Sequence, residues 1–229
     1  MKKAILFLAI LGFQYLSAQE ETKDPIFNMG PMVRLHGIYP INFGDNYLAD
    51  SNDSKVSFGI NLSLFEVYGF RLTGGIDHLY YNTNNVEMAA DVSRTKYTAV
   101  YGLLSYEIPI TQVLSVQPYL GGGWTNLNFK RQGEITRSNF YADFEDIGVS
   151  NQEGAEFRAG FYLDYKVAKV VSVFTGVNYI RGSYNINTAA EFEDYFGESS
   201  MVQISLGLKI GYTLRDKRKD KAAGQPKIQ

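Results

Sequence analysis

Large apolar residues occupy nearly every second position over several long stretches of this chain. In residues 201–214, MVQISLGLKIGYTL, the even-numbered positions from Val202 to Leu214 are apolar or aromatic, and the odd-numbered positions between them are polar or glycine. Residues 55–66 and 155–167 alternate in the same way. A period of two is the pattern of a β-strand that has one apolar face and one polar face. The chain is therefore predicted to be built from amphipathic strands.

Eight such segments follow one another, and most exceed the usual strand length of about five or six residues. They cover residues 32–43, 55–66, 70–81, 96–108, 114–129, 155–167, 170–184 and 201–214. The links between them are alternately short (67–69, 109–113, 168–169) and long (44–54, 82–95, 130–154, 185–200). Short turns alternating with long loops are typical of an up-and-down barrel in an outer membrane. An even strand number places both termini on the short-turn side, in the periplasm.

A bilayer explains both the alternation and the charges within it. In hydrocarbon every backbone N–H and C=O needs an internal partner, which a closed sheet provides. The apolar face then meets lipid, and Lys209 is expected inside, because a charge on the lipid face near mid-depth costs about 2–4 kcal/mol. A soluble, ligand-carrying barrel would have the opposite arrangement. Parity alone does not separate the two, but the long strands, the loop rhythm and the N-terminus favour the membrane.

Aromatic residues make up 14% of the chain and fall into two groups when the strands are threaded alternately up and down. Near the periplasmic ends lie Tyr68, Phe70, Tyr106, Tyr165 and Tyr212, and near the outer ends lie Tyr80, Trp124, Phe157 and Tyr179. Two aromatic belts are expected at the two interfaces of a membrane.

The N-terminus has the layout of a secretory signal peptide. Lys2 and Lys3 precede an apolar stretch, Ala4–Phe13, that is too short to span a bilayer as a helix, and the small residues Ser17 and Ala18 follow. We expect residues 1–18 to be the signal peptide, 19–28 a periplasmic segment, 29–214 the barrel, and 215–229 a basic, disordered periplasmic tail.

Three features carry a resemblance to a known family: the alternating strands, the stretch YLGGGW at 119–124, and the closing SLGLKIGYTL. In these features the chain resembles the small outer-membrane β-barrel family of Gram-negative bacteria, of the OmpA, OmpX and OmpW type. The resemblance covers about 29–214. It implies an all-β, eight-stranded, antiparallel up-and-down transmembrane β-barrel in the cell outer membrane, inserted by the barrel-insertion machinery. Such chains often end at an aromatic residue of the last strand. Here 215–229 follow, so the insertion signal would lie internally, around Tyr212.

Strand parity directs a set of charged side chains into the lumen. They are Arg34, His36, Arg71, Asp77, Glu107, Glu156, Arg158, Asp164, Lys166 and Lys209. An eight-stranded barrel is just wide enough for side chains to fill. Because positive and negative groups are nearly balanced, we expect them to pair and close the lumen as a structural network. A wide solute channel is not expected, and a narrow, water-lined leak remains an alternative.

The long loops contain two similar acidic-aromatic stretches, YADFEDIG at 141–148 and AEFEDYFG at 190–197. Their central residues are candidate patches for an extracellular or periplasmic protein partner: Phe144, Glu145, Asp146, Phe192, Glu193 and Asp194. Clustered carboxylates can also hold calcium or magnesium, but no regular metal-loop spacing occurs, so no metal or other cofactor is predicted. The chain has no cysteine and a net charge of -2, which excludes thiolate metal sites and gives no indication of a nucleic-acid partner.

The sequence is compatible with three functions. We expect a non-enzymatic outer-membrane protein that contacts lipid and lipopolysaccharide and displays its loops for structural, adhesion or interaction roles. The alternatives are a small pore for ions or solutes, and a lipid-modifying hydrolase, which would need Ser, His and an acid near the outer leaflet. Parity places Asp77 and His78 on opposite faces, and no serine lies beside His78 at a suitable spacing, so an enzyme is not expected.

Overall fold

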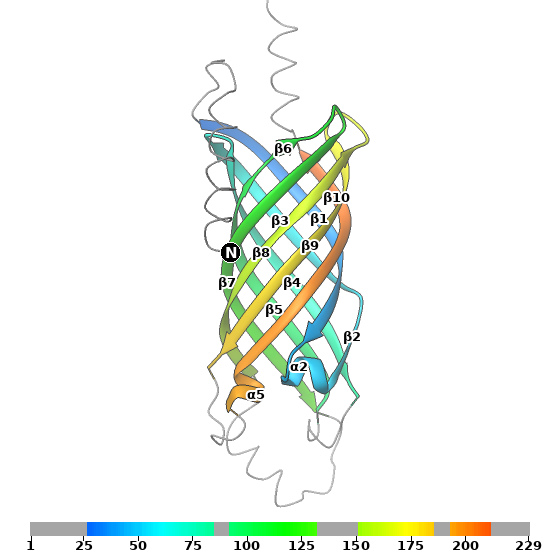
Figure 1. Ribbon diagram of the computed structural model, residues 1–229, viewed down its shortest axis with the longest axis vertical. Coiled ribbons are helices and arrows are strands. Elements are labelled where there is room, and N and C mark those ends of the chain that lie inside the picture. The colour runs from blue at the N-terminus through cyan, green and yellow to red at the C-terminus, as the bar shows by residue number, and fades with distance from the viewer. Residues whose placement is uncertain (1–26, 85–91, 132–150, 186–192, 212–229) are drawn as a thin grey trace, which may run out of the picture.

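Eight long antiparallel strands form a closed barrel (Figure 1). The computed structural model describes residues 27–84, 92–131, 151–185 and 193–211, and the predicted signal peptide, tail and Tyr212 lie outside them. The barrel strands are β1 (Phe27–Phe43), β3 (Ser57–Val67), β4 (Phe70–Thr83), β5 (Val92–Tyr106), β7 (Leu114–Arg131), β8 (Asn151–Lys166), β9 (Val171–Tyr184) and β10 (Glu198–Gly211). Each pairs with its neighbours in chain order, and β1 pairs with β10 to close the sheet. The predicted fold class is confirmed.

The two ends of the barrel differ. At one end, called the turn end, the connections are short. The turn between β3 and β4 consists of Tyr68 and Gly69, both with positive φ, as a type I′ hairpin turn needs. At the other end, called the loop end, lie two short helices and a short strand: α2 (Tyr47–Asp50), α5 (Glu193–Gly197) and β2 (Asn52–Ser54), which pairs with β4. A further short strand, β6 (Ile108–Pro109), pairs with β7 at the turn end.

In the part of the chain described here, no helix has the length and hydrophobicity to cross a membrane.

The polarity of the barrel is reversed relative to a soluble protein. Large apolar side chains are exposed on every barrel strand, and Leu206 in the middle of β10 is 65% exposed. Its neighbours in the sequence with the opposite parity, Ser205 and Gln203, are buried in the lumen, as is Lys209. The predicted orientation of the strands is therefore confirmed: the alternating apolar residues face outward, and Lys209 and its polar neighbours face the lumen.

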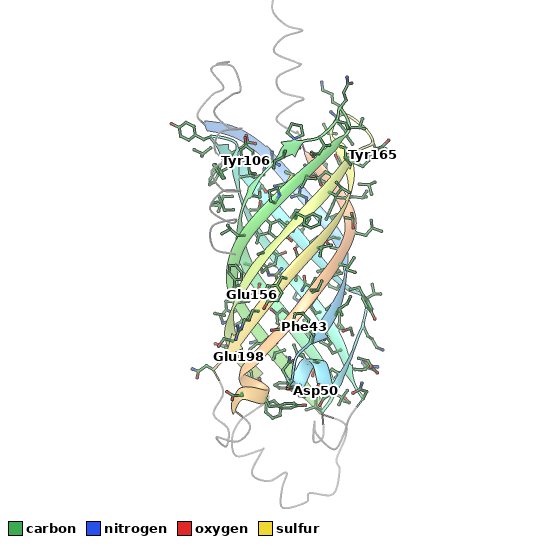
Figure 2. All side chains as sticks on the ribbon, viewed as in Figure 1. Phe43, Asp50, Tyr106, Glu156, Tyr165 and Glu198 are labelled. Carbon is green, nitrogen blue, oxygen red and sulfur yellow. The ribbon has the colours of Figure 1, made fainter. Side chains whose placement is uncertain are left out.

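Aromatic side chains line both ends of the apolar exterior (Figure 2). At the turn end Tyr68, Phe70 and Tyr165 are exposed, and Tyr106 is half-buried with its ring 5.3 Å from that of Phe70. Towards the loop end the exposed aromatic residues include the predicted Tyr80, Trp124, Phe157 and Tyr179, and also Tyr39, Phe43 and Phe58. These positions are those expected of two interfacial belts.

One irregularity in β3 changes which side chains face inward. The pairing of β3 with β4 shifts between Ser63 and Phe65, so one extra residue is accommodated there. A β-bulge of this kind reverses the parity of the residues that follow. As a result Glu66, which shares its parity with the lipid-facing Leu62, turns into the lumen and is buried.

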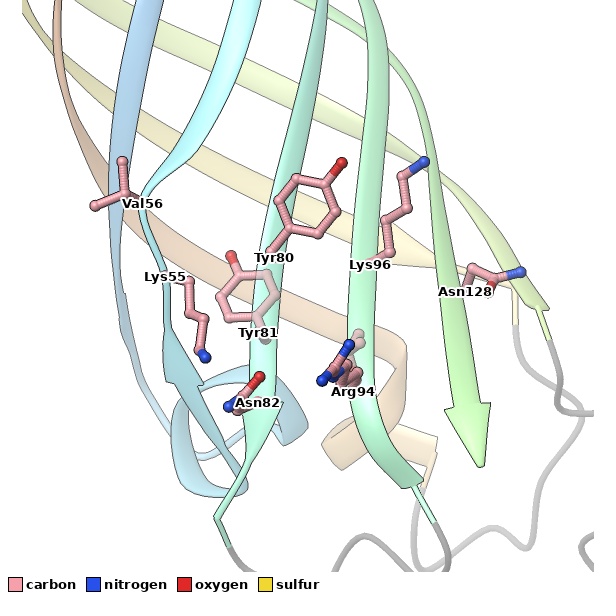
Figure 3. A pocket seen from close by; sticks show the side chains of 9 residues that line it. Lys55, Val56, Tyr80, Tyr81, Asn82, Arg94, Lys96 and Asn128 are labelled. Atoms are coloured by element: carbon pink, nitrogen blue, oxygen red, sulfur yellow. The ribbon is translucent and has the colours of Figure 1, made fainter. Parts of the chain in front are cut away.

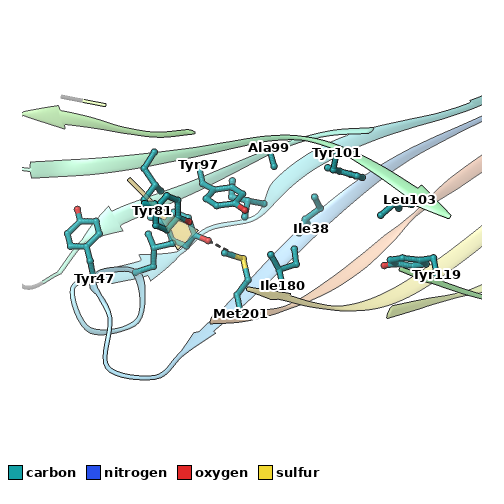
Figure 4. Packing of buried hydrophobic residues seen from close by; sticks show 14 of the residues in the cluster. Ile38, Tyr47, Tyr81, Tyr97, Ala99, Tyr101, Leu103, Tyr119, Ile180 and Met201 are labelled. Atoms are coloured by element: carbon teal, nitrogen blue, oxygen red, sulfur yellow. Dashed lines mark hydrogen bonds between the residues drawn. The ribbon is translucent and has the colours of Figure 1, made fainter. Parts of the chain in front are cut away.

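The lumen is filled by two kinds of side chain. A cluster of buried apolar and aromatic residues (Figure 4) begins at the loop end with Leu79, Tyr81 and Met201 and continues to Leu103 and Phe174 nearer the turn end. Charged and amide side chains, described below, share the middle and the turn-end half with it. The apolar part of the lumenal filling was not foreseen from the sequence.

The connection between β1 and β3 folds back into the barrel mouth. Tyr47 and Leu48 of α2 are buried in the lumenal cluster. The Tyr47 hydroxyl is hydrogen-bonded to Thr95 Oγ1 at 2.8 Å, and its ring lies 5.4 Å from that of Phe129 and 5.3 Å from that of Phe196 in α5. Burial raises the pKa of Tyr47 above its ordinary value. This segment was predicted to be only an external loop, and the buried side chains correct that interpretation.

Candidate functional site: the lumenal charge network

The middle of the lumen is organised around Asp77 on β4. Arg158 on β8 reaches across the barrel and donates from Nη1 to Asp77 Oδ2 at 2.5 Å. Tyr101 donates to Asp77 Oδ1 at 2.9 Å, and His36 Nε2 lies 3.4 Å from the same oxygen. Arg158 also donates to Glu156, and its guanidinium lies 3.6 Å from the centre of the Tyr101 ring. The single carboxylate of Asp77 is thus held by three neighbours, as a charge buried away from water requires.

Two glycines make room for this arrangement. Gly59 lies in register between His36 on β1 and Asp77 on β4, and these two side chains meet over it. A Cβ at Gly59 would collide with both. Gly75 lies in the same way between Asn61 and Tyr101, whose hydroxyl oxygen lies 2.6 Å from Asn61 Oδ1. The absent side chains allow residues on non-adjacent strands to touch.

A second group of charges lies towards the turn end. Asp164 on β8 accepts from Lys209 Nζ at 2.7 Å and from Arg34 Nη2 at 3.0 Å. Lys209 Nζ also lies 3.5 Å from Glu107 Oε2, and Arg34 donates to Gln117. These contacts connect β1, β8 and β10 with β7 and with the segment after β5. The network therefore fastens the seam where the first and last strands close the barrel.

The remaining predicted residues lie near this group. Arg71 donates to Glu66 Oε2 at 3.2 Å, and both side chains are buried. Lys166 is half-buried and lines a small hollow at the turn end together with Glu107 and Asp164. The structure therefore brings most of the predicted lumenal charges into pairs. It also adds Glu66, which the sequence parity concealed, and three polar partners whose inward parity was the only signal available: Gln117, Tyr101 and Tyr97, which donates to Glu156.

The network consists of ion pairs. Each carboxylate in it contacts at least one cation: Glu66 with Arg71, Asp77 and Glu156 with Arg158, Glu107 and Asp164 with Lys209. Paired charges of this kind rigidify an interior and are costly to separate. No group of three metal-ligating side chains occurs among the residues described by the structure.

His78 lies outside the lumen, apart from Asp77. Asp77 is fully buried inside the barrel, whereas His78 is only half-buried on the outer face. His78 Nδ1 is hydrogen-bonded to Thr98 Oγ1 at 3.1 Å, and its ring lies 5.5 Å from that of Phe58. The two residues therefore form no catalytic pair. The histidine that Asp77 does contact is His36, within the closed lumen.

The candidate loop patches are only partly described. Phe144, Glu145, Asp146, Phe192 and the side chain of Glu193 lie outside the described residues. Asp194 is exposed at the start of α5. The next two residues turn inward instead, since the Tyr195 hydroxyl is hydrogen-bonded to Ser51 Oγ at 2.9 Å and Phe196 packs on Tyr47. Tyr195 and Phe196 thus pack against the segment that folds into the mouth.

The arrangement of strands matches known structures. A major outer membrane protein from Thermus thermophilus aligns with a TM-score of 0.53 over 81% of this chain and 100% of that chain, at 10% identity. This chain has the eight-stranded outer-membrane β-barrel fold. The barrel also aligns with Neisserial surface protein A (TM-score 0.48, 12% identity, 80% and 99% of the two chains). A further match is the outer membrane enzyme PagL (TM-score 0.40, 14% identity, 77% and 98%). No family model and no curated relative matches the barrel's sequence.

Proposed function

We propose that this protein spans the outer membrane as a closed, non-enzymatic barrel, with its loop end outside the cell and its termini in the periplasm. Its role is structural or adhesive, through loop-end contacts with a protein partner and with outer-leaflet lipid. The observation that carries this proposal is the reversed polarity of the sheet. Exposed Leu, Ile, Val and Phe side chains surround all eight strands, while Arg34, Arg158 and Lys209 are buried inside. Soluble proteins rarely expose contiguous apolar surface beyond a few hundred Å².

The filled lumen argues against transport of solutes. The axis is occupied by the Asp77 and Asp164 clusters and, at the loop end, by Tyr47 and Leu48 of α2. A channel for solutes would require these side chains to part, which would separate buried ion pairs. In planar bilayers we expect no stable, discrete conductance levels. Reproducible discrete openings of the purified protein would favour the pore instead.

The absence of cysteine from the sequence allows a direct test of membrane topology. Single cysteines are placed on the lipid face (Leu206→Cys), at the loop end (Asp45→Cys) and at the turn end (Gln112→Cys). With a membrane-impermeant maleimide on intact cells, we expect labelling of Asp45→Cys alone. Gln112→Cys should react only after the outer membrane is permeabilised, and Leu206→Cys only after unfolding. Rapid labelling of Leu206→Cys in the folded protein would contradict the proposal.

The hydrolase alternative has its own test. We expect lipid A incubated with the folded protein to keep its mass, and the His78→Ala variant to give the same result. Loss of an acyl chain with the unaltered protein, abolished in His78→Ala, would make the barrel an enzyme.

A further inference from the structure

A hollow of about 530 Å³ lies on the outer face of the barrel near the loop end (Figure 3). It extends from the segment between β2 and β3, across β4 and β5, to β7. The residues that matter here are Lys55, Val56, Tyr80, Asn82, Arg94 and Lys96. Among them are three cations, on a surface that is otherwise mostly apolar.

Strand pairing brings the three cations to one place. Arg94 pairs with Asn82, and Lys96 pairs with Tyr80, in the register of β4 and β5. The backbone N–H of Lys55 donates to the carbonyl of Tyr80 at 2.9 Å. Adjacent strands are about 4.8 Å apart, so long basic side chains on either side of β4 can reach the same bound group. Figure 3 shows Lys55 and Arg94 on either side of Asn82.

Among the described residues, these cations have no carboxylate partner, unlike Arg158 and Lys209. Within the described ranges, no carboxylate oxygen lies within 4.0 Å of Lys55, Arg94 or Lys96. The nearby carboxylate of Asp53 accepts a hydrogen bond from Asn84 at 2.8 Å. For contrast, Arg181, exposed near the loop end on β9, is paired with Glu198 at 2.7 Å.

The hollow also lies at a defined depth. Along the outer face of β4 the side chains pass from Leu72 and Ile76 to Tyr80 and then to Asn82, which is the change from hydrocarbon to headgroup level. Val56 is 78% exposed beside the cations. A ligand at this place would meet positive charge and apolar surface together.

We propose that this hollow binds the phosphate of a phosphorylated glycolipid in the outer leaflet. Arg94 supplies a planar guanidinium that can grip two phosphate oxygens, and Lys55 and Lys96 add point charges. Val56 and Tyr80 contact the lipid beneath the phosphate. The inference rests on the proposed outer-membrane function, and it names the lipid chemistry that this surface recognises.

The test uses the full mature barrel in phosphatidylcholine nanodiscs, titrated with bis-phosphorylated lipid A and read by native mass spectrometry. Neutralising the hollow with Lys55→Gln, Arg94→Gln and Lys96→Gln together should weaken lipid A binding at least about tenfold, because several charge-assisted contacts are lost. Dephosphorylated lipid A should bind the unaltered barrel as weakly as bis-phosphorylated lipid A binds the triple variant. Arg181→Gln is the matched control, since it removes an exposed, paired arginine near the same end, and it should leave affinity unchanged within about twofold.

Three results would overturn the inference. The triple variant could bind lipid A as tightly as the unaltered barrel, or dephosphorylated lipid A could bind equally well. Inorganic phosphate could also displace lipid A at equal concentration, which would make the site one for free phosphate. A barrel that failed to insert would be recognised separately, by labelling of Leu206→Cys and by its gel mobility, and would count against the proposed function.

Discussion

Lys209 Nζ on β10 lies 2.7 Å from Asp164 Oδ2 on β8, although β9 separates these strands in the sheet. The bond therefore passes over the inner face of β9. Arg34 on β1 reaches the same carboxylate at 3.0 Å, so one acid holds three strands that meet around the closing seam. Lys209 is a charge within a strand whose other face meets lipid, and its pairing explains how the barrel tolerates it.

Asp164→Asn should therefore destabilise the barrel strongly. Lys209 and Arg34 would both lose their shared counter-charge in a buried site, and removing one partner of a buried pair costs about 3–5 kcal/mol. The measurement is the free energy of unfolding in urea, followed by tryptophan fluorescence in lipid vesicles. Glu198→Gln, which breaks the exposed pair with Arg181, is the control and should leave the unfolding midpoint in place. Equal effects of the two changes would show that the buried pair is not special.

The lipid-facing assignment of Leu206 predicts a second outcome. Leu206→Arg should reduce the stability of the inserted barrel by about 2–4 kcal/mol, because arginine near the bilayer midplane is costly on the lipid face. In a water-soluble barrel the same change at an exposed position would have little effect. Val167→Arg, at the exposed turn after β8, should cost no more than about 1 kcal/mol. A neutral Leu206→Arg would place that face in water.

Two adjacent glycines on β4 offer a matched pair. Gly75 faces inward, where a Cβ would collide with Asn61 and the Tyr101 ring, whereas a Cβ at Gly74 would meet nothing within 4 Å. We expect Gly75→Ala to lower the free energy of unfolding by about 1–3 kcal/mol through overpacking. Gly74→Ala should be neutral or slightly stabilising. The same assay as for Asp164→Asn distinguishes them, and a reversed order would mean that the lumen is loosely packed.

The position of α2 inside the mouth can be tested separately from barrel stability. Leu48→Asp places a charge in the apolar cluster, so α2 should leave the mouth while the strands stay paired. Hydrogen exchange should then accelerate at the amides of Asp50 and Ser51, which donate to Asn46 and Tyr47 in the folded protein. Asp45→Asn, at an exposed position nearby, should leave both amides protected. Unchanged exchange in Leu48→Asp would show that α2 does not depend on its burial.

Much of the architecture follows from local pattern. The alternation around Lys209 and Leu206 correctly predicts which face is apolar, because in a strand the direction of each side chain is set by its position alone. The prediction that the barrel lies in a membrane depended on strand length, loop rhythm and the N-terminus as well as on parity. The structure supports it by placing the apolar face outside. The candidate enzyme pair was rejected on the same basis, since adjacent Asp77 and His78 must point to opposite faces.

The strand pattern does not predict which lumenal side chains contact one another. Sequence parity placed His36 and Asp77 on the inside but gave no reason for them to meet. Their contact arises because β1, β3 and β4 are in register and Gly59 leaves a gap between them. Two further features that were not predicted, the inward turn of Glu66 and the burial of Tyr47, have a similar origin. One depends on a bulge and the other on a loop folding back.

From the sequence alone follow the eight barrel strands and the faces they present, because side-chain alternation is a local property of extended backbone. Tertiary structure decides which charges pair, how α2 packs in the mouth and that Lys55, Arg94 and Lys96 line one hollow. Those contacts join residues far apart in the chain, and they depend on strand register, on one bulge and on closure of the sheet. None of these can be deduced from the order of apolar and polar residues along a single strand.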